Sequence, residues 1–85
     1  MPYISNDNDK RINLDEIVEL MHELNVKADG DLNYILFKYC KKYVKPSYNN
    51  YKNFIAELTE CGREIARRLL APYEDKKIDE NGDVY

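Results

Sequence analysis

The sequence predicts an all-α fold, a three-helix domain with an extended N-terminal arm and a mostly irregular C-terminal tail. Two observations lead to this prediction. Apolar residues recur at intervals of three and four in three separate stretches, which is the spacing of amphipathic helices. Prolines follow the second and third stretches, and a proline disfavours the helical conformation in the residue before it. With 85 residues, we expect one domain at most.

The first helix is predicted at about 13–25. Residues 1–12 have no periodic pattern and indicate an extended or loosely docked arm. Asn13 offers a side-chain cap and Glu16 follows three residues later, the spacing of a capping box. The apolar residues of this helix are Leu14, Ile17, Val18, Met21 and Leu24. Its opposite face carries an acidic stripe, Asp15, Glu16, Glu19 and Glu23.

The second helix is predicted at about 31–45, capped by Asp29 or Asp31 and stopped by Pro46. Its main apolar face comprises Leu32, Ile35, Leu36, Tyr39 and Tyr43, widened by Phe37, Cys40 and Val44.

The third helix is predicted at about 47–71, from Ser47 to the residue before Pro72. It would span roughly 36 Å, longer than the other two can cover. One narrow sector holds Tyr51, Phe54, Ile55, Leu58, Gly62, Ile65 and Leu69. Gly62 either lets another helix approach closely or is simply tolerated there. The uncovered length of this helix would pair well with a second copy, so we expect a homo-oligomer through it. Residues 72–85 form the predicted tail, which divides the chain into an arm (1–12), a helical domain (13–71) and a tail.

Composition and motifs argue against several classes of function. The formal net charge of −3 argues against general nucleic-acid binding. Cys40 and Cys61 lack metal-ligand spacing and are interpreted as reduced core residues, and His22 stands alone. We therefore expect no metal and no cofactor. Familiar catalytic motifs are absent from the sequence, so we expect a protein that is not an enzyme. Without an apolar leader or membrane span, we expect a cytoplasmic protein.

A lysine face on the second predicted helix is the first candidate ligand site. Tyr34, Lys38, Lys41 and Lys45 follow one another at helical spacing, and Lys42 widens the face. A ring beside several ammonium groups suits a phosphate-bearing base, which would stack on the ring and be held by the charge. Two other interpretations remain open. The lysines are a solvated face, or they pair with the acidic stripe, within one chain or between copies.

A second candidate site lies near the predicted end of the third helix. Arg67 and Arg68 next to Tyr73 could hold a phosphate or carboxylate through paired hydrogen bonds. The same helix offers favourable surface pairs, and these favour a solvated face instead. The expected pairs are Glu60–Arg63, Glu64–Arg67 and Glu64–Arg68.

Four segments resemble one family of short, uncharacterised proteins of bacteriophages, prophages and bacteria. They are MPYI at the start, GDLNYIL, SYNNY, and RRLLAPYEDKKIDENGDVY at the end. The resemblance covers nearly the whole chain, and Gly62 and Ala66 depart from the residues usual in the family. It implies a phage-related setting and no established activity. Small phage proteins of this kind are often accessory factors, including inhibitors of host enzymes and counter-defence proteins that sequester signalling nucleotides.

Two functional hypotheses follow. The first is a phage-type accessory protein, in a counter-defence role, that binds a phosphate-bearing small molecule such as a signalling nucleotide at a subunit interface. The second is a protein–protein interaction module or inhibitor that docks on a host or phage protein through its tail and acidic first helix. A structural part of a phage assembly is not distinguished from the second hypothesis by sequence.

Overall fold

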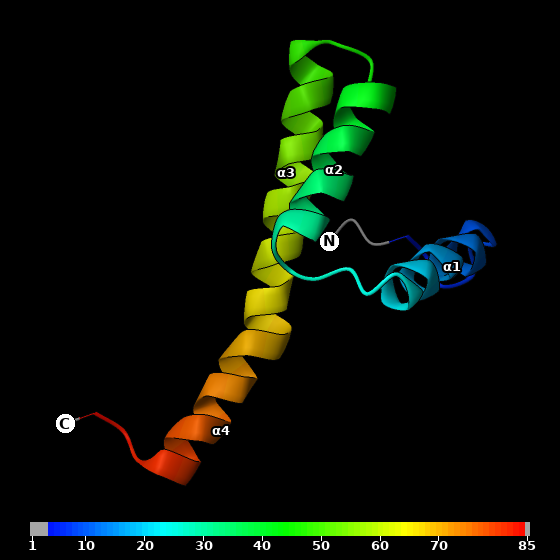
Figure 1. The fold of residues 1–85 in the computed structure, drawn as a ribbon. Coiled ribbons are helices and arrows are strands. Elements are labelled where there is room, and N and C mark those ends of the chain that lie inside the picture. The colour runs from blue at the N-terminus through cyan, green and yellow to red at the C-terminus, as the bar shows by residue number, and fades with distance from the viewer. Residues whose placement is uncertain (1–3, 85) are drawn as a thin grey trace. The chain divides into compact units, whose positions relative to one another are not determined.

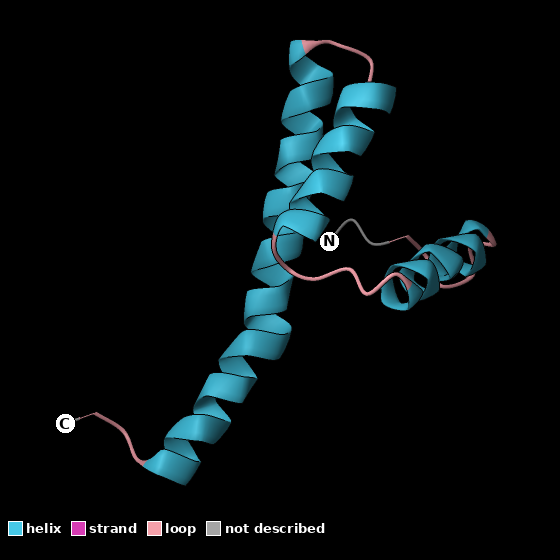
Figure 2. Ribbon diagram, viewed as in Figure 1, coloured by secondary structure: helices cyan, strands magenta, loops and turns pink. Residues whose placement is uncertain are grey.

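The computed structural model describes residues 4–84, and the regular elements in this range are helices (Figures 1 and 2). They are α1 (Lys10–Glu23), α2 (Gly30–Tyr43), α3 (Tyr48–Ile65), the π-helical turn η1 (Ala66–Leu70) and α4 (Ala71–Asn81). The predicted all-α class is confirmed. Residues 1–3 of the predicted arm and Tyr85 of the predicted tail lie outside the described range. The chain divides into two units, Met1–Tyr39 and Cys40–Tyr85.

Helix α1 begins at Lys10, earlier than predicted, so the capping box proposed at Asn13 is wrong. The side chain of Asn8 accepts a hydrogen bond from the Lys10 N–H at 2.9 Å. The backbone carbonyl oxygen of Asn8 accepts a hydrogen bond from the Arg11 N–H at 2.9 Å. Asn8 therefore satisfies donors at the helix start before the chain reaches Asn13, which lies inside the helix.

The end of α1 is set by Asn25, which adopts a left-handed conformation with φ of 56°. The Val26 N–H donates to the Met21 oxygen, and the Asn25 N–H to the His22 oxygen, each at 3.0 Å. This pair of bonds is the Schellman arrangement, in which a left-handed residue closes the last turn. Met21 and Val26 are both half-buried, as the apolar contact of that motif requires.

Side chains also cap α2 and α3, and the cap of α2 is Asp29, one of the two aspartates predicted for it. The Asp29 carboxylate accepts from the Asp31 N–H at 3.0 Å at the start of α2. At the start of α3, the Ser47 hydroxyl oxygen accepts from the Asn50 N–H at 3.0 Å. The Asn50 side-chain amide in turn donates to the Lys45 carbonyl oxygen at 3.0 Å. The connection around Pro46 is thus closed by local hydrogen bonds.

The prediction that Pro72 ends the third helix, leaving a mostly irregular tail, is wrong. Helix α3 passes through η1 into α4, and helical structure continues to Asn81 (Figure 1). A proline normally clashes with the carbonyl four residues before it and lacks the N–H that would bond there. Here the preceding turn is π-helical, and the Ala71 N–H donates to the oxygen of Ala66, five residues back. The wider turn accommodates the proline ring, and Gly82, with φ of 85°, ends α4.

No residue among 4–84 is buried in the single chain. Cys40 is half-buried and Cys61 is exposed, so the interpretation of Cys61 as a core residue is wrong. Large apolar side chains remain exposed on every helix, Ile17 on α1, Phe37 on α2, Ile55 on α3 and Tyr73 on α4 among them. The apolar faces are formed, but the described chain does not close them into a core.

Candidate interaction surfaces

Tyr34 and Lys38 of the predicted lysine face meet on α2. The Lys38 ammonium donates to the Tyr34 hydroxyl at 2.8 Å and lies 5.1 Å from the centre of its ring. Lys41 lies in the last turn of α2, and Lys45 lies beyond that helix, in the connection to Ser47. All four side chains belong to exposed residues. The structure therefore joins two of the four predicted residues in one pair and leaves the other two further along the chain.

The predicted arginine site has a different arrangement. Arg67 donates to the Glu64 carboxylate at 2.8 Å, and the Glu64 side chain is only 17% exposed. Arg68 is exposed and lies with Arg67 in η1, whereas Tyr73 lies in α4. The ammonium group over the Tyr73 ring is that of Lys77, at 5.6 Å. An anion at Arg67 would therefore compete with a carboxylate that already holds the guanidinium.

Acidic and basic side chains pair along the helix surface as the sequence predicts. Arg63 donates to Glu60 at 3.1 Å, and Arg67 pairs with Glu64. Lys77 and Glu80 form a third pair at 3.1 Å that the sequence analysis did not anticipate. Each pair joins residues three apart on the helix surface and is worth about 0.2–0.5 kcal/mol.

The tyrosine–lysine pair predicted at Tyr34 and Lys38 recurs at two places that sequence reasoning missed. Within residues 4–84, lysines lie over tyrosine rings four residues earlier in the chain, in the pairs Tyr34–Lys38, Tyr48–Lys52 and Tyr73–Lys77. The four-residue spacing places both side chains on one helix face, so it was a signal visible in the sequence. Exposed pairs of this kind contribute about 0.5–1 kcal/mol each.

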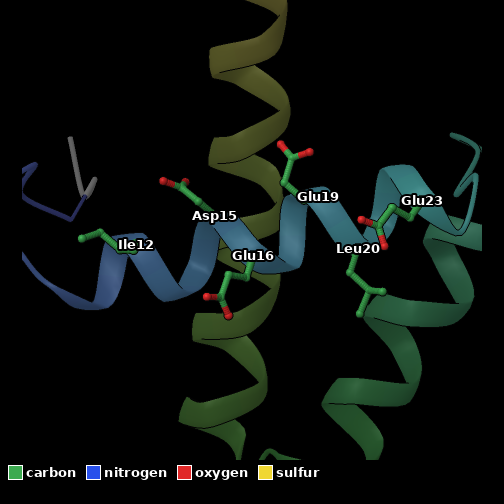
Figure 3. A pocket seen from close by; sticks show the side chains of 6 residues that line it. All are labelled: Ile12, Asp15, Glu16, Glu19, Leu20 and Glu23. Atoms are coloured by element: carbon green, nitrogen blue, oxygen red, sulfur yellow. The ribbon is translucent and has the colours of Figure 1, made fainter.

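A hollow lies along α1, lined by Ile12, Asp15, Glu16, Glu19, Leu20 and Glu23 (Figure 3). Asp15 and Glu19 point to one side of the helix, while Glu16 and Leu20 point to the other (Figure 3). The carboxylates do not converge on one point, which binding of a cation would require. Within residues 4–84 there is no group of three His, Cys, Asp or Glu side chains suited to a metal. In the same range, no helix combines the length and the apolar character needed to cross a membrane.

A further surface is the apolar side of α3 and its continuation. Phe54 is half-buried, and the other large side chains of the predicted sector are exposed. Gly62 lies among them, and a Cβ atom built on it would meet no atom within 4 Å. The face therefore has room at Gly62 for a side chain from another helix.

Comparison with known proteins identifies a family for this chain. Neither the curated proteins nor the solved structures contain a match to this chain. A family described as Domain of unknown function (DUF6899) matches residues 1–84, in agreement with the resemblance of nearly the whole chain to a family without established activity. The chain belongs to this DUF6899 family.

Proposed function

We propose that the protein is a non-enzymatic binding protein that completes its fold against another protein chain. One observation carries this proposal: residues 4–84 contain no buried side chain, while every helix exposes large apolar residues. Burial of apolar surface is the main favourable term in folding, about 25 cal/mol per Å². Isolated helices shorter than about 12–15 residues are marginal in water. A partner chain would supply the missing burial.

The partner of the long helix is proposed to be a second copy of the chain, and a host or phage protein is the proposed target. Helix α4 supports the docking role, because it presents Ile78 as an exposed apolar side chain at the end of a continuous helix. The setting we propose is that of a bacteriophage accessory protein in the bacterial cytoplasm. The family resemblance of the C-terminal segment supports this setting.

The test is the concentration dependence of structure in the full chain. Sedimentation velocity gives the oligomeric state, and circular dichroism gives the helix content and thermal midpoint of the same samples. If assembly supplies the burial, the midpoint rises with concentration, because association stabilises the folded state by mass action. A monomer whose helix content and midpoint do not depend on concentration would contradict the proposal.

A second candidate function, capture of a phosphate-bearing small molecule, is favoured by the Tyr34–Lys38 pair. The pair already holds an ammonium group beside an exposed aromatic ring, at 2.8 Å from its hydroxyl. A base could stack on the ring while Lys38 and Lys41 contact the phosphate. In a subunit interface, as expected from the sequence, the loss of water would strengthen both contacts.

Charge reversal tests this second candidate. Binding of a purine nucleoside monophosphate, with inorganic phosphate in parallel, is measured by calorimetry on Lys38→Glu/Lys41→Glu. The matched control Lys10→Glu/Lys27→Glu changes net charge equally at lysines outside the lysine face, in α1 and in the connection that follows it. Loss of binding in the first variant alone supports the site, whereas equal affinity in both rejects it. Deleting residues 74–85 should leave this binding intact and abolish docking through α4.

A further inference from the structure

The apolar side of the long helix follows a heptad pattern that the π-helical turn extends. Along α3 the spacing alternates between three and four residues, through Tyr48, Tyr51, Ile55, Leu58, Gly62 and Ile65. This alternation is the signature of a helix that packs lengthwise against another helix. Continued without change, the pattern would reach Leu69, Pro72 and Lys76.

The π-helical turn changes which residues continue this pattern. Its Ala71 N–H bonds five residues back, so the turn contains one residue more than an α-helical turn. The step from Ile65 is therefore five residues and reaches Leu70, after which Tyr73 follows and Pro72 falls outside the pattern. We call the resulting set the seam, and it comprises Tyr48, Tyr51, Ile55, Leu58, Gly62, Ile65, Leu70, Tyr73, Lys77 and Glu80.

The seam is complementary to its own reversed copy. When the seam is aligned with its reversed copy, its one small residue faces a large one and its other central residues face apolar residues. Lys77 and Glu80 at one end face tyrosines at the other end. Gly62 comes opposite Ile65, and Leu58 opposite Leu70. The remaining pairs are Ile55 with Tyr73, Tyr51 with Lys77, and Tyr48 with Glu80.

We infer that two copies of the chain pack antiparallel along the seam, with the two-fold axis between Gly62 and Ile65. The inference rests on the self-association in the proposed function. In such an interface each residue meets its counterpart twice, once in each direction. The open space at Gly62 receives Ile65 of the second copy, because nothing lies within 4 Å of the position a Cβ would take.

A parallel pair would be poorer for two physical reasons. Gly62 would face Gly62 of the second copy and leave a void, and voids in an apolar interface are destabilising. Lys77 and Glu80 would each face the same charge in the other copy, whereas opposed charges favour pairing. In the antiparallel pair these two side chains meet tyrosine hydroxyls instead, at the outer ends of the seam.

The exposed side chains of the seam offer a large part of the area that a stable dimer buries. Tyr48, Tyr51 and Tyr73 are 80%, 39% and 58% exposed. At about 150–250 Å² per aromatic side chain, they offer roughly 350 Å². That is nearly half of the ~800 Å² that each partner of a standard interface buries. Exposed aliphatic residues add to it, namely Ile55, Leu58, Ile65 and Leu70.

Cysteine cross-linking of the full chain tests the orientation and the register together. In a Cys40→Ser/Cys61→Ser background, Leu58→Cys and Leu70→Cys are prepared separately, oxidised alone and oxidised as a mixture. Antiparallel packing brings residue 58 of one copy opposite residue 70 of the other. A disulfide dimer is therefore expected in the mixture and not in either variant alone. Ile55→Cys and Tyr73→Cys form a second pair for the same register, and circular dichroism verifies the helix content of each variant.

Each other result has a defined meaning. Cross-linking of each variant with itself would show a parallel pair and overturn the inference. A dimer by sedimentation without either cross-link would place the interface elsewhere, which also overturns the inference but leaves the proposed self-association standing. A monomeric cysteine-free chain that keeps its helix content would overturn both.

Discussion

The connections around Pro46 and Pro72 show that the same residue has opposite effects in two regions of this chain. At Pro46 the chain leaves α2 after Tyr43 and begins α3 at Tyr48, with the Ser47 side chain capping the new helix at 3.0 Å. At Pro72 the helix continues, because the turn before it is π-helical. A proline separates two helices where a cap starts the next one, and it is accommodated where the preceding turn widens.

The largest effect is expected when a proline is placed where there is neither a capped helix start nor a preceding π-helical turn. Thr59→Pro removes an N–H in the middle of α3, where the turn is α-helical. We expect a loss of about 3 kcal/mol or more in helix stability, because the ring also clashes with the carbonyl four residues earlier. Thermal unfolding followed by circular dichroism measures this loss.

Thr59→Ala is the control for this substitution. It removes the hydroxyl that donates to the Ile55 carbonyl at 3.1 Å but keeps the backbone N–H. A proline at residue 59 tolerated as well as Pro72 would show that the π-helical turn is not what accommodates Pro72.

Replacing Pro72 distinguishes an effect on helix stability from an effect on dimer formation. Pro72→Ala removes the residue that the π-helical turn accommodates, so the helix content should rise or stay the same. A regular α-helix would move Leu70 and Tyr73 off the seam. We therefore expect the dissociation constant of the dimer to rise about tenfold, which corresponds to a loss of about 1.4 kcal/mol in dimer stability.

Sedimentation equilibrium measures this change, with Ala71→Ser as a nearby control that keeps the proline. A dimer strengthened by Pro72→Ala would contradict the seam that includes Leu70 and Tyr73.

The smallest effect is expected at the cap next to Pro46. Ser47→Ala deletes the oxygen that accepts the Asn50 N–H. The loss should be about 1 kcal/mol of helix stability, the usual contribution of such a cap. Ser47→Asp restores an acceptor and should recover most of the thermal midpoint. Equal destabilisation by alanine and aspartate would show that Ser47 does not act as a cap.

The candidate sites were predictable only in part. The Tyr34–Lys38 contact and the Glu60–Arg63 and Glu64–Arg67 pairs follow from residue spacing on one helix. The grouping of Arg67, Arg68 and Tyr73 stays a prediction, since the lysine over the Tyr73 ring is Lys77. Spacing in the sequence indicates that charged and aromatic side chains are near one another. It does not decide which basic side chain lies over a given ring.

The sequence by itself determined the helical class, an aspartate cap at the start of α2 and the break at Pro46, because each depends on residues within a few positions of the backbone groups concerned. Only the three-dimensional structure decided that α1 begins before Asn13 and that helix runs past Pro72 to Asn81. The effect of a proline depends on the geometry of the turn before it. The hydrogen bond from the Ala71 N–H to the Ala66 oxygen could not be predicted from the spacing of the apolar residues.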